Sequence, residues 1–321
     1  MIANLHLHSV FSDGTQWPEE IVVRAKHAGY QVIALTDHDT MQGTADFTSA
    51  CKHHGIASVP GVEIDCIAPE FSFDKEMLGY FPRGKFTHTI EFTEHIREDR
   101  MRKIHQYLDQ SRDIVFKAHP RSAELTYTEL VTFKLGFCND HVSTLPFSWN
   151  KSNFYYFLCS KKILDEKDVS SKSSANEDSY KVFKKKYFMP DLLGDPVKEK
   201  KQSLDEVVAI MLKDGGFPIL PHYGHLYDDD INKIKKNEDN LLKFLRHCRD
   251  IGVWGVEQYY YGSSSSTSAI NDLLVKICKK YDLGFGFTFG SDCHGRGHET
   301  CTLELFSGDF PGFPGTSKAK L

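Results

Sequence analysis

Short apolar segments that alternate with helical segments constrain the fold of this chain more than any other feature of its sequence. An apolar run at 2–7 is followed by a helical segment that begins at Pro18 and ends at Gly29, and then by a second apolar run at 32–35. Proline in the first turn and glycine just past the end are typical of a helix, and a short continuous apolar run is typical of a strand buried on both faces. The N-terminal part of the chain therefore predicts strand–helix–strand units with parallel strands.

The same alternation continues towards residue 80 and returns after residue 200. Ser203, with Glu206 three positions later, has the pattern of a capping box and marks the start of a helix. Further strands are expected at 56–64, 77–81, 217–220, 253–258 and 285–289, and further helices at 42–53, 241–249 and 269–279. About seven strands, most of them followed by helices, predict an α/β fold in which parallel strands form a barrel.

The middle of the chain interrupts this order. A helix is expected at 91–109, and the sequence between 161 and 186 is rich in lysine, serine and aspartate with few apolar residues, which is typical of a solvated loop. We therefore predict a barrel domain made of residues 1–90 and 195–321. Residues 91–194 would form a mainly helical insertion that caps the active site.

Composition narrows the class of protein further. With 40% hydrophobic and 26% charged residues, the chain is typical of globular proteins. It contains no run of about 18 apolar residues, so no membrane span is predicted. The N-terminus has no secretion-signal pattern. The eight cysteines are scattered without a CxxC pair, which disfavours a disulfide framework or a thiolate zinc site and favours a cytoplasmic location. The formal charge of −5 gives no general attraction to nucleic acid, and the sequence leaves the oligomeric state open.

Histidines and carboxylates recur where the predicted strands end. His6 and His8 are two residues apart at the end of the first strand, and Asp292 and His294 are two apart after the last. This spacing turns both side chains of a pair to the same side. Because the strand ends of such a barrel form its active-site face, we expect these side chains to meet. Other residues in such positions are Asp13, His38, Glu63 and His222.

Several segments together resemble the PHP (polymerase and histidinol phosphatase) superfamily, in particular its small-molecule and nucleotide phosphoesterases. They are LHLHSVFSDGT, AGYQVIALTDHDTMQG, VPGVEI, LGYF, ILPHYG and GSDCHG, and they cover residues 2–80 and 203–297. The resemblance implies a distorted (β/α)7 PHP barrel with a metal cluster at its mouth.

The resemblance also implies three groups of metal ligands. The first ion would be held by His6, His8, Glu63 and Asp292, the second by Asp13, His38 and His294, and the third by Glu63, Glu76 and His222. The family usually has histidine where this chain has Glu76. All donors are nitrogen or oxygen, so two or three divalent ions of manganese, iron or zinc are expected.

The implied reaction is hydrolysis of a phosphate monoester of a small metabolite or nucleotide by a metal-activated hydroxide. Asp292 would act at the reacting centre, and His225 is a candidate for stabilising or protonating the leaving group. Substrate-binding residues are expected in the insertion, at Arg100, Lys151 and Asn153.

Three alternatives stay open. The chain could be an exonuclease that trims short oligonucleotides, a hydrolase of amides or lactones, or a metal-binding module without catalysis. An exonuclease would use basic and aromatic contacts to the strand, and Lys184, Lys185, Lys186, Tyr187 and Phe188 offer a short segment of that kind. A module without catalysis predicts lost ligands, and only the Glu76 position departs from the family pattern, to another ligand type.

Overall fold

The computed structural model describes residues 1–118, 125–136, 146–161, 201–259, 265–296, 303–305 and 308–316. The chain divides into two compact units, one of Met1–His95 with Lys201–Leu321 and one of Ile96–Lys200. The helices and strands are β1 (Ile2–Asn4), α1 (Pro18–His27), β2 (Val32–Leu35), α2 (Thr44–His54), β3 (Ala57–Ala68), η1 (Pro69–Phe71), β4 (Phe73–Tyr80), α3 (Thr87–Ala118), α4 (Tyr127–Leu135), α5 (Lys151–Ser160), β5 (Gln202–Ser203), α9 (Leu204–Lys213), β6 (Phe217–Leu220), η3 (Tyr223–Tyr227), α10 (Ile231–Lys236), α11 (Glu238–Ile251), β7 (Gly255–Tyr259), α12 (Ser265–Lys280), β8 (Gly286–Gly290), η4 (Leu303–Leu305) and β9 (Gly308–Asp309).

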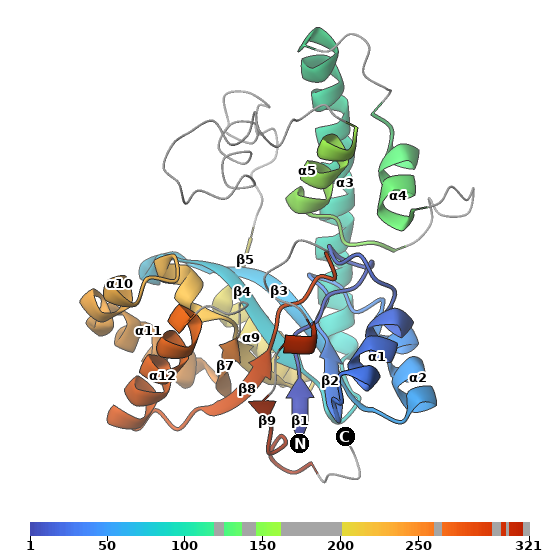
Figure 1. Cartoon of the computed structure of the whole chain (residues 1–321). Coiled ribbons are helices and arrows are strands. Elements are labelled where there is room, and N and C mark those ends of the chain that lie inside the picture. The colour runs from blue at the N-terminus through green and yellow to red at the C-terminus, as the bar shows by residue number, and fades with distance from the viewer. Residues whose placement is uncertain are drawn as a thin grey trace. The chain divides into compact units, whose positions relative to one another are not determined.

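A nearly closed, barrel-shaped sheet surrounded by helices forms the first unit (Figure 1). Its strands follow one another in the order β8–β7–β6–β4–β3–β2–β1–β9, and β5 pairs with β3. Just after β1, the Leu5 N–H donates a 2.8 Å hydrogen bond to the Phe289 carbonyl of β8 and so joins two distant strands of this order. The α/β barrel predicted from the sequence is confirmed by this architecture.

Strand β4 departs from the all-parallel arrangement that the alternation predicts. It pairs antiparallel with β3 and β6, whereas β1–β2–β3 and β6–β7–β8 are parallel. Only residues 69–72 separate β3 from β4, and this link is too short for the crossover that a parallel pair requires. The start of β4 therefore lies beside the C-terminal half of β3, with Glu76 opposite Asp65.

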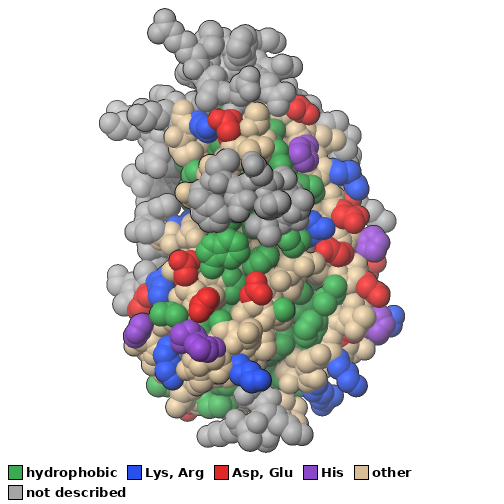
Figure 2. Space-filling view, turned by 90° about the vertical axis from the view of Figure 1, so that its right-hand side faces the viewer, with side chains coloured by type: hydrophobic (Ala, Val, Ile, Leu, Met, Phe, Trp, Pro, Cys, Tyr) green, Lys and Arg blue, Asp and Glu red, His purple; other side chains and the backbone are tan. Residues whose placement is uncertain are grey.

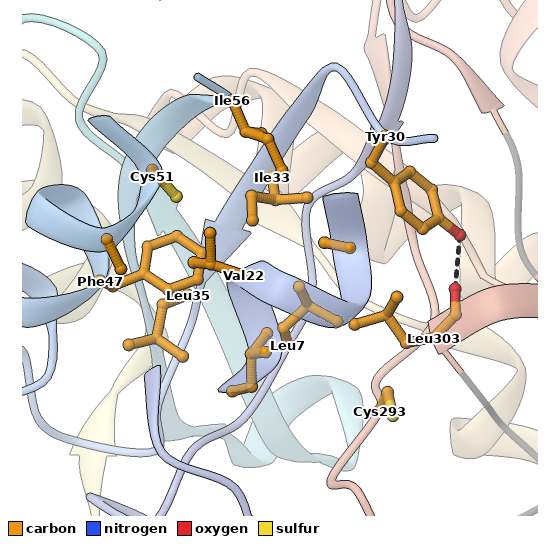
Figure 3. Close-up of a cluster of buried hydrophobic side chains, with 13 residues drawn as sticks. Leu7, Val22, Tyr30, Ile33, Leu35, Phe47, Cys51, Ile56, Cys293 and Leu303 are labelled. Carbon is orange, nitrogen blue, oxygen red and sulfur yellow. Dashed lines mark hydrogen bonds between the residues drawn. The ribbon is translucent and has the colours of Figure 1, made fainter. Parts of the chain in front are cut away.

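A buried apolar cluster joins helices α1 and α2 to the first strands (Figure 3). Val22 of α1 and Phe47 of α2 belong to this cluster together with Ile33 and Leu35 of β2. Cys293, which follows β8, is a further member. Because side chains alternate along extended chain, Cys293 faces the core while its two neighbours can face the end of the barrel.

The second unit has a buried apolar core of its own. Ile104 and Leu108 of α3 belong to it together with Trp149 and with Phe154 and Phe157 of α5. Helix α3 is longer at both ends than the helix predicted at 91–109. The solvated loop predicted between 161 and 186 lies outside the described residues except for its first position. A capping role for this unit stays a prediction.

In the part of the chain that the structure describes, none of the helices combines the length and apolar character needed to cross a membrane.

Two leucines that differ in burial allow a direct test of the barrel core. Leu78 of β4 is fully buried among apolar side chains, whereas Leu212 of α9 is 41% exposed. We expect Leu78→Ala to lower the free energy of unfolding by about 2–5 kcal/mol, because it removes buried methyl groups and leaves a cavity. Leu212→Ala should change it by about 0.5 kcal/mol or less. Urea-induced unfolding of the two variants measures the difference, and equal effects would contradict the placement of β4 in the core.

Candidate metal centre

The predicted ligands lie at one end of the barrel, on segments that are far apart in the sequence. His6 and His8 follow β1, and His38 follows β2. Glu63 lies in the middle of β3 rather than at its end, because this strand extends to Ala68 and pairs with β4 from Gly61 to Ala68. The remaining members are Asp13 in the turn after His8, Glu76 in β4, His222 after β6, and Asp292 and His294 after β8.

The first group of ligands brings two imidazoles against two carboxylates. His6 Nε2 lies 3.2 Å from Glu63 Oε2 and 3.4 Å from Asp292 Oδ1. His8 Nε2 lies 3.3 Å and 3.0 Å from the same two oxygens. One donor atom from each of these four residues therefore points to a common position.

The second group centres on Asp13. Its Oδ1 lies 3.1 Å from His294 Nε2, 3.8 Å from His38 Nε2 and 4.0 Å from His8 Nδ1. The rings of His8 and His294 are stacked, with centroids 4.3 Å apart. His8 was expected in the first group alone, and the structure places its second ring nitrogen in this group as well.

The third group shares Glu63 with the first. Its Oε1 lies 3.1 Å from His222 Nε2, while its Oε2 faces His6 and His8. Glu76 offers a carboxylate oxygen to the same group. Glu63 therefore turns one oxygen to each of two neighbouring groups, which is the arrangement that a bridging ligand requires.

The distances and the unsatisfied atoms both fit divalent ions. Nitrogen and oxygen ligands lie about 2.0–2.2 Å from such an ion, so two ligands at a right or tetrahedral angle are about 3.0–3.5 Å apart. The closest contacts within each group fall in this range. Among the described residues, His6 Nε2, both ring nitrogens of His8 and Glu63 Oε2 are buried without a hydrogen-bond partner. Buried polar atoms normally have partners, and shared cations would supply them here.

The centre is deeply buried, and the exposure of its members differs. The side chains of His6, His8 and Glu63 are inaccessible, whereas those of Asp292 and His38 keep 13% and 16% of their surface. Solvent therefore reaches the centre at Asp292 and His38. A fourth possible group lies on the surface of the barrel unit and consists of Glu70, Asp205 and His247. Two of its members are exposed, so water can satisfy them without an ion.

Electrostatic compensation keeps the carboxylates charged. Burial raises the pKa of Asp13, Glu63 and Asp292, but the surrounding histidines outweigh it and hold the pKa of each well below its usual value. Burial also lowers the pKa of His38 and His222, yet Glu63 and its neighbouring carboxylates raise both to about 9. For His8, burial and the nearby His294 and His38 lower the pKa to about 3.

Sequence reasoning missed three residues that hold ligands in place. Glu257 of β7 lies 2.9 Å from His6 Nδ1, and Arg296 Nη2 lies 3.1 Å from Asp13 Oδ2. Asp37 accepts hydrogen bonds from Ser9 and Ser12 and so shapes the turn that carries Asp13. The available signal for Glu257 was a carboxylate directly after the apolar residues of a predicted strand.

His225, the candidate for leaving-group chemistry, lies beside the third group. Its ring centroid is 4.5 Å from that of His222, and its Nε2 is 3.5 Å from Asp229 Oδ2. Burial and the neighbouring His222 lower the pKa of His225 to about 3. Its imidazole is therefore neutral near pH 7 and can take part in hydrogen bonds as donor or acceptor.

The residues predicted to bind substrate all belong to the second unit. Arg100 is buried, and its Nη1 donates to the Trp149 carbonyl at 3.3 Å. Lys151 and Asn153 begin α5, where Asn153 Oδ1 accepts from the Asn150 N–H and completes a capping box. The structure thus gives Asn153 a structural role, and the substrate-binding role of all three stays a prediction.

The fold and the site together define an α/β barrel protein with a histidine–carboxylate centre suited to several divalent ions. The family model of the PHP domain matches residues 4–176, which is more than half of the chain. The chain therefore belongs to the PHP domain family, and the resemblance drawn from its motifs is confirmed.

Curated relatives match short parts of the chain. An error-prone DNA polymerase of Nocardia farcinica is 42% identical over 96 residues, which are 28% of this chain and 8% of that protein. A 5'-3' exoribonuclease of Haemophilus influenzae is 48% identical over 61 residues, 19% of this chain and 22% of that protein. A 3',5'-nucleoside bisphosphate phosphatase of Chromobacterium violaceum is 41% identical over 61 residues, 19% of this chain and 21% of that protein. Each alignment spans less than a quarter of the relative.

Solved structures match most of the chain at low identity. A protein of Bifidobacterium adolescentis provisionally described as a metal-dependent phosphoesterase aligns with a TM-score of 0.63 and 19% identity, over 92% of this chain and 91% of its own. An amidohydrolase of Chromobacterium violaceum, with bound sulfate and no metal, aligns with a TM-score of 0.64 and 22% identity, over 96% and 92%. At these identities the likeness shows a shared fold.

The raised pKa values of His38 and His222 predict that metal loading releases protons. With a pKa of about 9, both imidazoles are protonated near pH 7.5 in the metal-free protein, and a metal ligand must be neutral. Isothermal titration in buffers of different ionisation enthalpy should show net proton release near pH 7.5, and the release should decline as the pH rises above about 9. Metal binding without proton release would contradict these protonation states.

Proposed function

We propose that this protein is a metal-dependent phosphoesterase that hydrolyses a phosphate monoester of a nucleotide or small metabolite. The observation that carries this proposal is the convergence of three ligand groups at one end of the barrel, linked through His8 and Glu63. A module that only binds metal needs one closed site, whereas linked groups of ligands are typical of hydrolytic centres that use more than one ion. Manganese, iron and zinc all suit the mixed nitrogen and oxygen donors.

Comparison with relatives supports phosphate esters as the substrate class. The aligned segments of the exoribonuclease and of the bisphosphate phosphatase belong to proteins that are named for reactions at phosphate esters. We therefore rank a phosphate ester above an amide or lactone. The amidohydrolase has a similar fold, so hydrolysis of an amide stays the alternative if no phosphate ester is cleaved. A cytoplasmic location also stays a proposal, which rests on the scattered cysteines of the sequence.

The residues of the centre would divide the work between holding ions and handling the substrate. When bound, divalent ions at such a centre provide a nucleophile from water near neutral pH and neutralise charge on phosphate oxygens. Glu63 and His8 would link neighbouring ligand groups, because each belongs to two of them. His225, neutral near pH 7, would donate a hydrogen bond to the leaving oxygen. Arg100, Lys151 and Asn153 stay the proposed contacts of the substrate.

Short oligonucleotides are the second candidate substrates. The 48% identity to the exoribonuclease over 61 residues favours them. On the face drawn in Figure 2, lysine and arginine side chains lie interspersed with aspartate and glutamate, so the described residues of that face form no continuous basic surface. A long nucleic acid needs such a surface, whereas a mononucleotide or short oligonucleotide does not.

The first experiment measures product release by the manganese-loaded protein. The panel contains nucleoside 3',5'-bisphosphates, nucleoside monophosphates, sugar phosphates, and short RNA and DNA, with inorganic phosphate and mononucleotides as the measured products. We expect Asp292→Asn to lower the rate at least about 100-fold, since even residues that only hold a ligand in place contribute 10–100-fold.

Asp282→Asn is a matched control for this variant. Asp282 is exposed on the loop before β8, and both aspartates have positive φ, 47° for Asp282 and 53° for Asp292, which asparagine tolerates. Release of phosphate from one class that is lost only in Asp292→Asn would support the proposal. Absence of hydrolysis of every phosphate ester by the metal-loaded protein would reject it.

If Glu76 is a metal ligand, its side chain determines whether the third group holds an ion. Burial, Asp65 and Glu63 raise the pKa of Glu76, so a cation bound between Glu76 and Glu63 would relieve this repulsion. We expect Glu76→Gln to bind one manganese ion fewer than the wild type at saturation, with the other groups still filled. Metal analysis after equilibrium dialysis measures the stoichiometry. Glu238→Gln serves as the control, because Glu238 is partly exposed and pairs with Lys280 rather than with a member of the centre. An unchanged stoichiometry would exclude Glu76 as a ligand.

A further inference from the structure

Glu257 is a fully buried carboxylate next to the metal centre that belongs to none of the ligand groups. It lies in β7, and its exposed surface is 0%. Burying a carboxylate is costly unless hydrogen bonds or opposite charges compensate it. Its contacts therefore indicate why the barrel tolerates a charge at this position.

Each oxygen of Glu257 contacts a different ligand-bearing segment. Oε1 lies 2.9 Å from His6 Nδ1, and Oε2 accepts a 3.3 Å hydrogen bond from the backbone N–H of His222. A carboxylate can only accept here, so the Nδ1 of His6 carries the proton and donates it. The opposite ring nitrogen, Nε2, faces Glu63 and Asp292 and is the atom of His6 that would bind a cation.

Strand β8 lies beside both β7 and β1, so the contact between Glu257 and His6 spans this strand. Glu257 is paired with Thr288 of β8, and Gly290 stands two residues further along the same strand. A Cβ atom at Gly290 would collide with Glu257 Oε1 and with the His6 Cβ. The absence of a side chain at Gly290 therefore opens the space in which the two groups meet.

We propose that Glu257 is a positioning residue for the metal centre, which orients the His6 imidazole and the start of the His222 segment before an ion binds. This inference rests on the proposed metal centre. A partner that fixes the tautomer and ring orientation of a ligating histidine strengthens metal binding, and its loss costs 10–100-fold in affinity. Gly290 supports the same arrangement by leaving room for it.

Glutamine at position 257 separates this role from simple space filling. Glu257 uses both oxygens as acceptors, and glutamine has nearly the same shape but only one acceptor oxygen. In either orientation its amide group would turn a donor towards the donor of His6 or of His222. The variant therefore keeps the packing of β7 and loses the orientation of one ligand-bearing segment.

The experiment titrates zinc or manganese into the chelator-treated protein and measures binding against a competing chelator. We expect Glu257→Gln to bind the most affected ion about 10–100-fold more weakly than the wild type. Glu304→Gln serves as the matched control, because Glu304 pairs with Arg24 away from the centre. Gly290→Ala should weaken binding in the same direction. Circular dichroism checks that each variant is folded.

A measurement on the wild type keeps the inference testable if the variants do not fold. In nitrogen-15 spectra of zinc-loaded protein, His6 should show a protonated Nδ1 and a metal-bound Nε2. Metal bound through Nδ1 would overturn the inference, as would equal affinity of Glu257→Gln and wild type. If the wild type binds no divalent ion, the proposed metal centre fails, and the inference fails with it.

Discussion

The buried carboxylate of Glu63 is the group on which the rest of the centre depends. Its Oε2 lies 3.2–3.3 Å from nitrogens of His6, His8 and His38, and its Oε1 lies 3.1 Å from His222. A carboxylate that is withdrawn from water needs compensating positive charge, which either protonated imidazoles or divalent ions can provide. The two kinds of compensation exclude each other at a given nitrogen, so proton binding and metal binding compete. The loops that carry the histidines are held together by this shared requirement.

Backbone pairing near the end of the barrel brings the most distant ligands together. The His8 N–H donates to the Cys293 carbonyl at 3.0 Å, which sets the segment after β1 beside the segment after β8. Cys293 turns into the apolar cluster while Asp292 and His294 face the centre. The alternation of side chains thus gives one short segment two functions, since it anchors itself in the core and presents two ligands. Any change that loosens this pairing would separate His6 and His8 from Asp292.

Local sequence patterns predicted the elements of this barrel better than their directions and long-range contacts. The apolar runs at 32–35 and 217–220 coincide with β2 and β6, because buried parallel strands need continuous apolar residues. The direction of β4 was missed, since an apolar run alone carries no direction. The strands predicted at 56–64 and 77–81 also left a longer link than residues 69–72, which join β3 and β4 in the structure. The candidate ligands were predicted from their recurrence near strand ends, except Glu76, which only the resemblance to the PHP superfamily implied. The contact between Glu257 and His6 spans 251 positions, and no local pattern reports it.

The three ligand groups differ in donor chemistry, and this difference bears on which ions they suit. The group around Asp13 offers three imidazoles and one carboxylate, whereas the group of Glu63, Glu76 and His222 offers two carboxylates and one imidazole. Imidazole-rich sites suit zinc and iron, and carboxylate-rich sites suit manganese and magnesium. The glutamate at position 76 therefore shifts the third group towards harder ions relative to a histidine there. Because Glu63 belongs to this group and to the first, a cation bound in the third group would also change the net charge around the first group.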